Sequence, residues 1–198
     1  MCAPDLGPGG FEQGSIMKRV SYNPPNHAHF LTFSCYRKLK LLTSDDVCGL
    51  LTEAWNEARR RGNFDIWAYV IMPEHTHLLI YPRNENYEMS KMLRRLKEQF
   101  GHKVVDHWKD ISTHLLDLIK VRRGSRLIHR FWQEGGGYDR NLYNWDGIGR
   151  AIDYIEWNPV RRGLVTDPLE WEGSSARSRA GARDVPLVVD EIRFTYRY

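Results

Sequence analysis

Two histidines, His75 and His77, lie in the most telling segment of the sequence, PEHTHLLI at residues 73–80. Apolar and β-branched residues there favour a strand. Because side chains alternate between the faces of a strand, both imidazoles would point the same way. Together they can hold one divalent ion, although a third ligand must then come from elsewhere in the fold. Taken alone, the pair is explained more simply as two half-exposed strand histidines.

A tyrosine and an asparagine one helical turn apart, Tyr154 and Asn158, form the second candidate group. They lie beside an apolar stripe at helical spacing, which predicts a helix from a cap at Asp146 to Pro159; the stripe is Ile148, Ala151, Ile152 and Ile155. Residues four apart share one helix face, so a phenol that can attack and an amide oxygen that can bind metal would be neighbours. The simpler alternative is a tyrosine at the edge of the core and an asparagine in the turn before a proline.

The elements that must position these groups follow the order β-α-β-β-α-β-α. Strands are expected at 29–36, 64–72, 75–81 and, interrupted by three glycines, 131–141; helices are expected after an N-cap at Ser44, at 89–105 and at the tyrosine. This is the ferredoxin-like split βαβ pattern with an added helix, an α+β fold built on an antiparallel sheet. Residues 107–129 are ambiguous, and we treat them as an insertion with a short helix at 111–119 and a basic loop containing Arg122, Arg123 and Arg126.

The chain of 198 residues is expected to form one domain with appendages. Residues 1–20, rich in Gly and Pro, are predicted to be a flexible leader. The domain would cover residues 21–165. The polar segment 166–198 would be a C-terminal extension packing on or near it.

The composition favours a cytoplasmic protein with a polyanionic partner. The sequence pI is about 9.0, and arginines cluster at 59–61, 94–95, 122–123 and 161–162. Three cysteines without CxxC spacing suggest neither a disulfide framework nor a thiolate metal site. No apolar run is long enough for a membrane span or a secretion signal, so we expect no membrane partner.

Taken together, the motifs resemble those of the REP-associated tyrosine transposases, single-tyrosine HUH enzymes related to the smallest insertion-sequence transposases. The resemblance is carried by PEHTHLL at 73–79, FWQ at 131–133 with YDR at 138–140, and YIEWNPVRRGLV at 154–165, in the right order from about His27 to Val165. It implies the HUH endonuclease fold, with the added helix as the catalytic helix.

The resemblance also implies a mechanism. His75, His77 and Asn158 would hold Mg²⁺ or Mn²⁺ against a scissile phosphate. Tyr154 would attack that phosphate, giving a 5′-phosphotyrosine and a free 3′-hydroxyl. An ordinary tyrosine has a pKa of about 10, so some charge or base must make phenolate available. The residues do not identify this base, and for the adjacent carboxylates Glu74 and Asp153 we expect a solvated surface role.

Relatives of this kind recognise palindromes folded as DNA hairpins with a short single-stranded stretch beside the stem. The residues expected to contact phosphates are basic: Lys91, Arg94, Arg95, Lys103, Arg122 and Arg123. Trp132 would either stack on an unpaired base or belong to the core. Tyr138 and Tyr143 are rival nucleophiles by residue type, although neither has a metal-capable partner one turn away.

Two functions remain open at this point. One is a metal-dependent single-strand DNA endonuclease and strand transferase; the other is a hairpin-DNA-binding regulator that has lost cleavage. A replication initiator or relaxase of the same chemistry would usually be larger. A monomer and a homodimer are both compatible with the resemblance.

Overall fold

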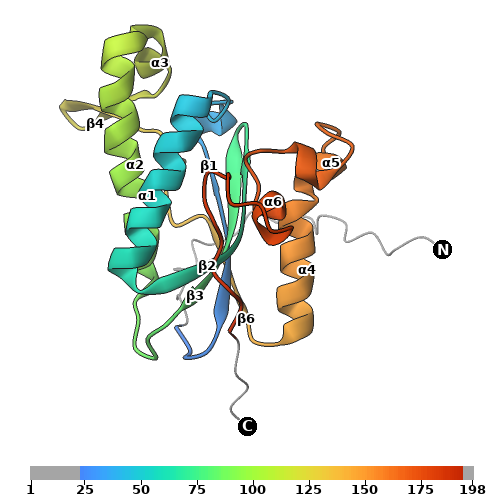
Figure 1. Cartoon of the computed structure of the whole chain (residues 1–198). Helices are drawn as coiled ribbons and strands as arrows, with labels where there is room; N and C mark the ends of the chain where they lie inside the picture. The colour runs from blue at the N-terminus through green and yellow to red at the C-terminus, as the bar shows by residue number, and fades with distance from the viewer. Residues whose placement is uncertain (1–22, 194–198) are drawn as a thin grey trace, which may run out of the picture.

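The computed structural model describes residues 23–193, so the expected leader at 1–20 lies outside the described residues. Its centre is a four-stranded antiparallel sheet of order β2-β3-β1-β6 (Figure 1). The strands are β1 (Ala28–Ser34), β2 (Phe64–Met72), β3 (His75–Pro82) and β6 (Tyr138–Leu142). The helices are α1 (Asp45–Gly62), α2 (Met89–Ile111), α3 (Thr113–Leu118), α4 (Trp145–Glu156), α5 (Asn158–Arg161) and α6 (Ala176–Arg179).

The strand order confirms the ferredoxin-like pattern. β3 lies between β1 and β2 and is antiparallel to both, as the split βαβ arrangement requires. Helix α1 begins after Ser44, whose hydroxyl accepts a hydrogen bond from the Val47 amide, so the expected N-cap is confirmed. The predicted strand at 64–72 has the bounds of β2.

Helices cover both faces of the sheet (Figure 1). Helices α1 and α2 pack on one face around the larger core, which contains Leu31, Phe33, Trp55, Ile66, Leu78 and Phe100. Helix α4 packs on the other face through Ile148, Ile152 and Ile155, against Trp67, Val70, Met72 and Leu79. A strand covered on both faces has no solvent side, which is why all nine residues of β2 are buried.

The predicted strand at 131–141, interrupted by three glycines, pairs with the β1 segment on both sides of the glycines, but only its second half is a regular strand. Trp132 forms only an isolated bridge with Cys35, and the regular strand β6 begins at Tyr138. The break follows from Gly137, which has φ of +80° and lies so close to β1 that a Cβ would stand 2.2 Å from the Thr32 carbonyl oxygen. Only glycine fits that approach.

The expected basic loop after the insertion's helix is instead a two-stranded ribbon. β4 (Lys120–Arg123) pairs with β5 (Arg126–His129) across a turn of two residues. The sequence signal was a Gly-Ser pair between two short runs of strand-forming residues, a pattern typical of a tight hairpin. Helix α3 lies within the expected range, whereas α2 continues six residues beyond the predicted end at 105.

The C-terminal segment lies along the outer edge of β2, the side that has no neighbouring strand in the sheet. The amides of Ile71, Tyr69 and Ile66 donate to Gly173 O, Ser175 Oγ and Asp190 Oδ2, and the carbonyls of Tyr69 and Ile66 accept from the amides of Ser175 and Asp190. Trp171 and Arg179 side chains donate to the Ile71 and Trp67 carbonyls. An edge paired in this way has few free groups left to recruit a strand from another molecule.

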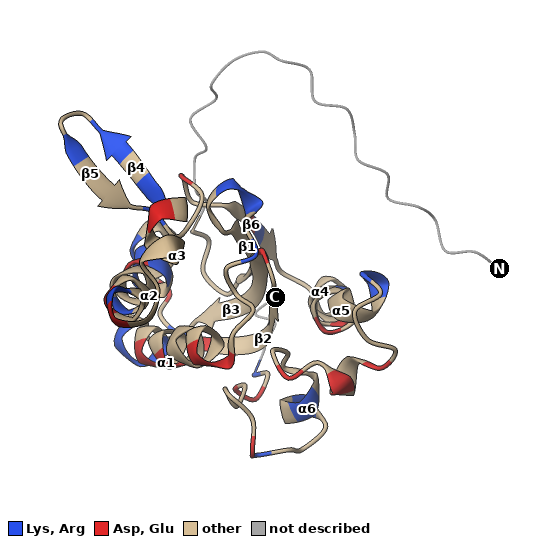
Figure 2. Cartoon of the chain, turned by 90° about the horizontal axis from the view of Figure 1, so that it is seen from above, with Lys and Arg blue, Asp and Glu red and all other residues tan. Residues whose placement is uncertain are grey.

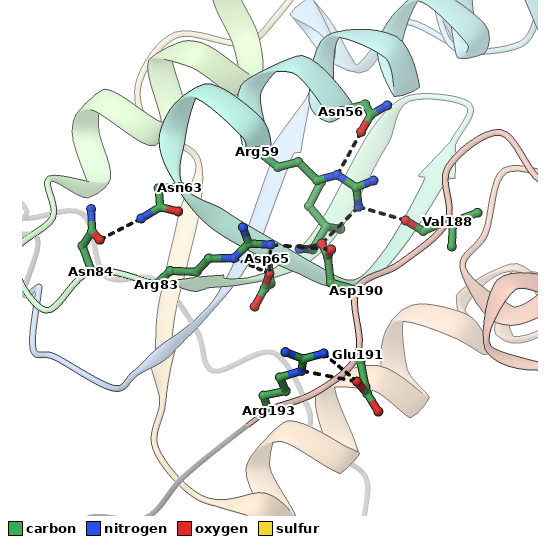
Figure 3. A network of polar contacts seen from close by, with 11 residues as sticks. Asn56, Arg59, Asn63, Asp65, Arg83, Asn84, Val188, Asp190, Glu191 and Arg193 are labelled. Carbon is green, nitrogen blue, oxygen red and sulfur yellow. Dashed lines mark hydrogen bonds and ion pairs between the residues drawn. The ribbon is translucent and has the colours of Figure 1, made fainter.

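Asp190 connects this segment to the sheet and to α1 (Figure 3). Its Oδ2 accepts from the Ile66 amide at 2.9 Å and from Arg59 Nη1 at 3.0 Å, and Arg83 Nη2 lies 3.8 Å from its Oδ1. Arg59 also donates to the Val188 carbonyl, and Arg83 is hydrogen-bonded to Asp65. One carboxylate therefore joins three parts of the chain.

We expect Asp190→Ala to lower the free energy of unfolding by about 2 kcal/mol, because it leaves the buried Ile66 amide without its side-chain acceptor and removes the ion pair with Arg59. Urea denaturation followed by circular dichroism measures the change. Asp184→Ala is the matched control, since Asp184 is 82% exposed. Equal stability of the two variants would contradict this role of Asp190.

Candidate active site

The two histidines of β3 meet at their Nε2 atoms, which lie 3.2 Å apart. Because the two histidines are two residues apart on the strand, both rings lie on the same side of the sheet, with ring centroids 4.8 Å apart. An ion bound at about 2.1 Å by two nitrogens separates them by roughly 3.0 Å at a right angle and roughly 3.4 Å at the tetrahedral angle. The spacing therefore suits two ligands of one divalent cation.

Each imidazole is held at its other nitrogen. His77 Nδ1 lies 2.7 Å from the Thr32 hydroxyl on the neighbouring strand β1. His75 Nδ1 lies 3.2 Å from Glu74 Oε1, a carboxylate that must accept the ring proton. The proton on Nδ1 leaves the His75 Nε2 lone pair free, which is the tautomer a metal-binding histidine needs.

Glu74 is not the solvated carboxylate expected from the sequence. It is the turn residue before β3 rather than part of a regular strand, and its side chain is only 15% exposed. Its Oε1 also accepts from Arg162 Nη2 at 3.0 Å, in the segment that follows α5. Burial alone would raise the pKa of Glu74, but the Arg162 hydrogen bond and the His75 ring outweigh it and lower that pKa. Glu74 therefore stays ionised and orients His75.

Both imidazoles are kept neutral. Burial, reinforced by the neighbouring His75, lowers the pKa of His77 to about 3. Burial also lowers the pKa of His75, against the opposing charge of Glu74. Neutral rings keep lone pairs available for a cation at physiological pH.

The Tyr154 ring packs against His77 within the same chain. The two ring centroids are 5.3 Å apart, and Phe30 contacts the tyrosine from β1 at 5.8 Å. Arg161 lies over the phenol ring, with Cζ 5.2 Å from its centroid, and donates to the Tyr154 carbonyl. Tyr154 is 44% exposed, so a large substrate can reach it.

The single helix expected to carry both Tyr154 and Asn158 is broken between them. Helix α4 ends at Glu156, and α5 begins with Asn158 and Pro159. The break lies here because a proline has no amide hydrogen to donate and its ring crowds the carbonyl four residues earlier. The N-cap of α4 is Asn144 rather than Asp146, since its Oδ1 accepts from the Gly147 amide at 2.7 Å. The two residues are therefore not a regular pair on one helix face.

Asn158 nevertheless has a side chain suited to an added ligand. It is 6% exposed, and its Oδ1 is buried without a hydrogen-bond partner in the described part of the chain. Among residues 23–193 no cluster of three or more His, Cys, Asp or Glu side chains could hold a metal ion, so a third ligand must be of another type. The amide oxygen of Asn158 meets that requirement, and Arg162, four residues on, reaches Glu74 beside His75.

A cleft of about 510 Å³ opens beside the tyrosine. Its walls come from β1, β3, β6 and α4 and carry aromatic rings and two arginines: Phe30, His77, Tyr138, Arg140, Arg150 and Tyr154. Neither arginine has an ion-pair partner within the described ranges. Aromatic faces next to unpaired guanidinium groups suit unpaired bases and their phosphates.

The chain matches the family model described as "Transposase IS200 like" over residues 25–118, which include both histidines. It is 31% identical over 149 residues to a Haemophilus influenzae protein assigned to the REP-associated tyrosine transposases, covering 74% of this chain and 78% of that protein. The chain belongs to the REP-associated tyrosine transposase family. The Escherichia coli member is 27% identical over 139 residues, covering 70% of this chain and 69% of that protein.

The fold is that of the family as well. A solved structure of a REP-associated tyrosine transposase bound to a REP hairpin superimposes with a TM-score of 0.66 and 22% identity, covering 91% of this chain and 94% of that one. At this identity the likeness concerns the fold alone. Within residues 23–193, no helix of this family member has the length and apolar character of a membrane span.

The basic residues predicted to bind DNA do not form one surface with the tyrosine. Lys91, Arg94, Arg95 and Lys103 lie on α2, which covers the sheet face opposite α4. Arg122 and Arg123 lie on the β4–β5 ribbon. Trp132 is 6% exposed and packs among Phe33, Phe100 and Phe131, so the core alternative holds for it.

We expect the His77 ring of metal-free protein to stay neutral through pH 5, because its pKa falls to about 3 on folding. The unfolded chain, with an ordinary histidine pKa of about 6.5, takes up a proton in that window. Folding therefore becomes less favourable as pH falls from 6.5 towards 3. Ring ¹⁵N chemical shifts in EDTA-treated protein measure this titration. A midpoint near 6.5 in folded protein would rule out the buried neutral state.

Proposed function

We propose that this protein is a metal-dependent single-strand DNA endonuclease and strand transferase that acts on palindromic hairpin DNA through a 5′-phosphotyrosine intermediate. The observation that carries the proposal is the contact of the exposed Tyr154 ring with His77, whose Nε2 lies 3.2 Å from that of His75. In this proposal the nucleophile and two of the cation ligands come from one chain.

The donor set fits Mg²⁺ or Mn²⁺. His75 and His77 would supply two nitrogens and Asn158 its unpartnered amide oxygen, which leaves positions open for phosphate oxygens and water. A bound divalent cation neutralises charge on the phosphate and orients the scissile bond. Thr32 and Glu74 would fix the rings so that this geometry exists before DNA arrives.

The chemical step is a phosphoester exchange. The Tyr154 hydroxyl loses its proton and its oxygen forms a bond to phosphorus; the bond to the 3′-oxygen breaks, and that oxygen takes up a proton. One ester replaces another, so the reverse attack by a 3′-hydroxyl can rejoin strands without ATP. The Arg161 guanidinium over the phenol ring would help to hold the ring in place.

The cleft between α4 and β6 would hold the unpaired strand that carries the scissile phosphate. Arg140 and Arg150 provide charge for the backbone, and Phe30 and Tyr138 provide ring faces for bases. Because the cleft also opens on His77, a strand lying in it passes the site where the tyrosine and the two histidines meet.

Tyr154→Phe is expected to abolish covalent adduct formation while leaving hairpin binding within about threefold, because it removes only the attacking oxygen. The assay incubates protein with labelled hairpin DNA carrying a single-stranded flank and Mn²⁺, then separates adducts in denaturing detergent gels. Tyr143→Phe, at another exposed tyrosine, is the matched control and keeps the adduct. Loss of the adduct in Tyr138→Phe but not in Tyr154→Phe would move the nucleophile to Tyr138, and no adduct with unaltered protein would favour the non-cleaving regulator.

We expect His75→Ala and Asn158→Ala each to weaken Mn²⁺ binding at least tenfold, because each removes one proposed ligand. Isothermal titration calorimetry of EDTA-treated protein measures affinity independently of cleavage. Asn84→Ala removes an amide remote from the site and should bind Mn²⁺ as the unaltered protein does. If Asn158→Ala binds Mn²⁺ equally well, Asn158 is not a ligand.

A further inference from the structure

The β4–β5 ribbon projects from the body of the protein beside α2 and α3 (Figure 2). Lys120 pairs with His129 at its base and Arg123 with Arg126 at its tip, across a turn at Gly124 and Ser125. Gly124 has φ of +62°, which suits the first position of a tight hairpin turn. Six of its eight strand residues are exposed, so the protein maintains a two-stranded ribbon that contributes little to its core.

The ribbon carries unpaired positive charge on both of its faces. Paired residues of an antiparallel ribbon share a face, so Arg122 lies on one side and Arg123 and Arg126 on the other. None of these three arginine side chains has a hydrogen-bond or ion-pair partner between residues 23 and 193. Leu127, opposite Arg122, is 59% exposed. An isolated hairpin is marginally stable in water, which points to a ligand as the reason for keeping this one.

The base of the ribbon is attached at the end of the sheet where β3 begins with His75. The Arg130 amide donates to the carbonyl of the buried Ile119 and closes the base. The next residue, Phe131, accepts through its carbonyl from the Tyr36 amide, and the Cys35 amide donates to the Glu74 carbonyl. A few hydrogen bonds thus connect the ribbon to the turn that carries Glu74 and leads into His75.

From this arrangement we propose that the β4–β5 ribbon enters the major groove of the duplex stem of the hairpin substrate. The groove is about 12 Å wide and admits a two-stranded ribbon, whose strands are about 4.8 Å apart. Inside it, arginines on opposite faces meet the two phosphate strands that form its walls, which a single basic face could not do. Leu127 is available for contact with base edges. The inference rests on the proposed hairpin-DNA function and adds the element that binds the paired part of the substrate.

The stem and the unpaired strand would then be bound by different elements. The ribbon binds the stem, and the cleft lined by Arg140 and Arg150 binds the strand that Tyr154 cuts. Removing the ribbon charges should therefore reduce selection of hairpins without altering the chemistry on a strand that is already bound.

The test uses full-length protein in which Arg122, Arg123 and Arg126 are all replaced by Gln. The matched control replaces Arg60, Arg183 and Arg193, three exposed residues outside the ribbon, so the loss of charge is the same. Fluorescence anisotropy measures binding to a hairpin with a flank and to the unpaired flank alone, from 50 to 200 mM salt. Thermal unfolding of both variants, with midpoints expected within about 2 °C of the unaltered protein, shows that the fold is intact.

We expect the ribbon variant to bind the hairpin about 100-fold more weakly and to lose about three units from the slope of log affinity against log salt, since each lost phosphate contact removes about one. Its affinity for the unpaired flank and its adduct yield at saturating DNA should match those of the control. Methylation of stem guanines at N7, which lies in the major groove, should interfere with binding by the unaltered protein.

Three results would overturn the proposal: equal hairpin affinity for the two variants, an equal loss on the unpaired flank, or no interference from N7 methylation. Failure of the proposed function looks different. In that case the unaltered protein forms no adduct, whichever variant binds the stem.

Discussion

The packing of α4 on the second face of the sheet is the constraint on which the candidate site depends. Ile148, Ile152 and Ile155 bury themselves against β2 and β3, on the face opposite α1 and α2. These three isoleucines fix the position of α4 on the sheet. Tyr154, on the same helix, is thereby held against His77. The ferredoxin-like core alone would provide the histidines without a phenol beside them.

The orientation of the two imidazoles depends on contacts from three separate segments. Thr32 comes from β1, Glu74 from the turn before β3, and Arg162 from the segment after α5. Desolvation keeps the rings neutral, and these partners leave the two Nε2 atoms facing each other. The two Nε2 atoms lie 3.2 Å apart, a separation that a proton carried by one ring or a bound cation can bridge. The arrangement is consistent with a site prepared for metal before DNA binds.

The outer edge of β2 and the β4–β5 ribbon differ in how far the rest of the protein covers them. Along β2 the C-terminal segment satisfies the edge with backbone bonds, side-chain donors and the Asp190 carboxylate, so that edge is closed to other strands. The β4–β5 ribbon has no such cover and carries three unpaired arginines.

The sequence alone determined the sheet, its order of elements and the pairing of His75 with His77 on one face, because periodicity and alternation are local properties. It also indicated Tyr154 through the stripe beside it and through the resemblance to the transposase family. The role of Glu74 and the burial of Trp132 were decided only by tertiary structure. Each depends on groups distant in the chain: Arg162 lies 88 positions from Glu74, and Phe33 and Phe100 enclose Trp132. The Gly-Ser turn of the ribbon was visible in the sequence, whereas its projection from the body of the protein was visible only in the structure.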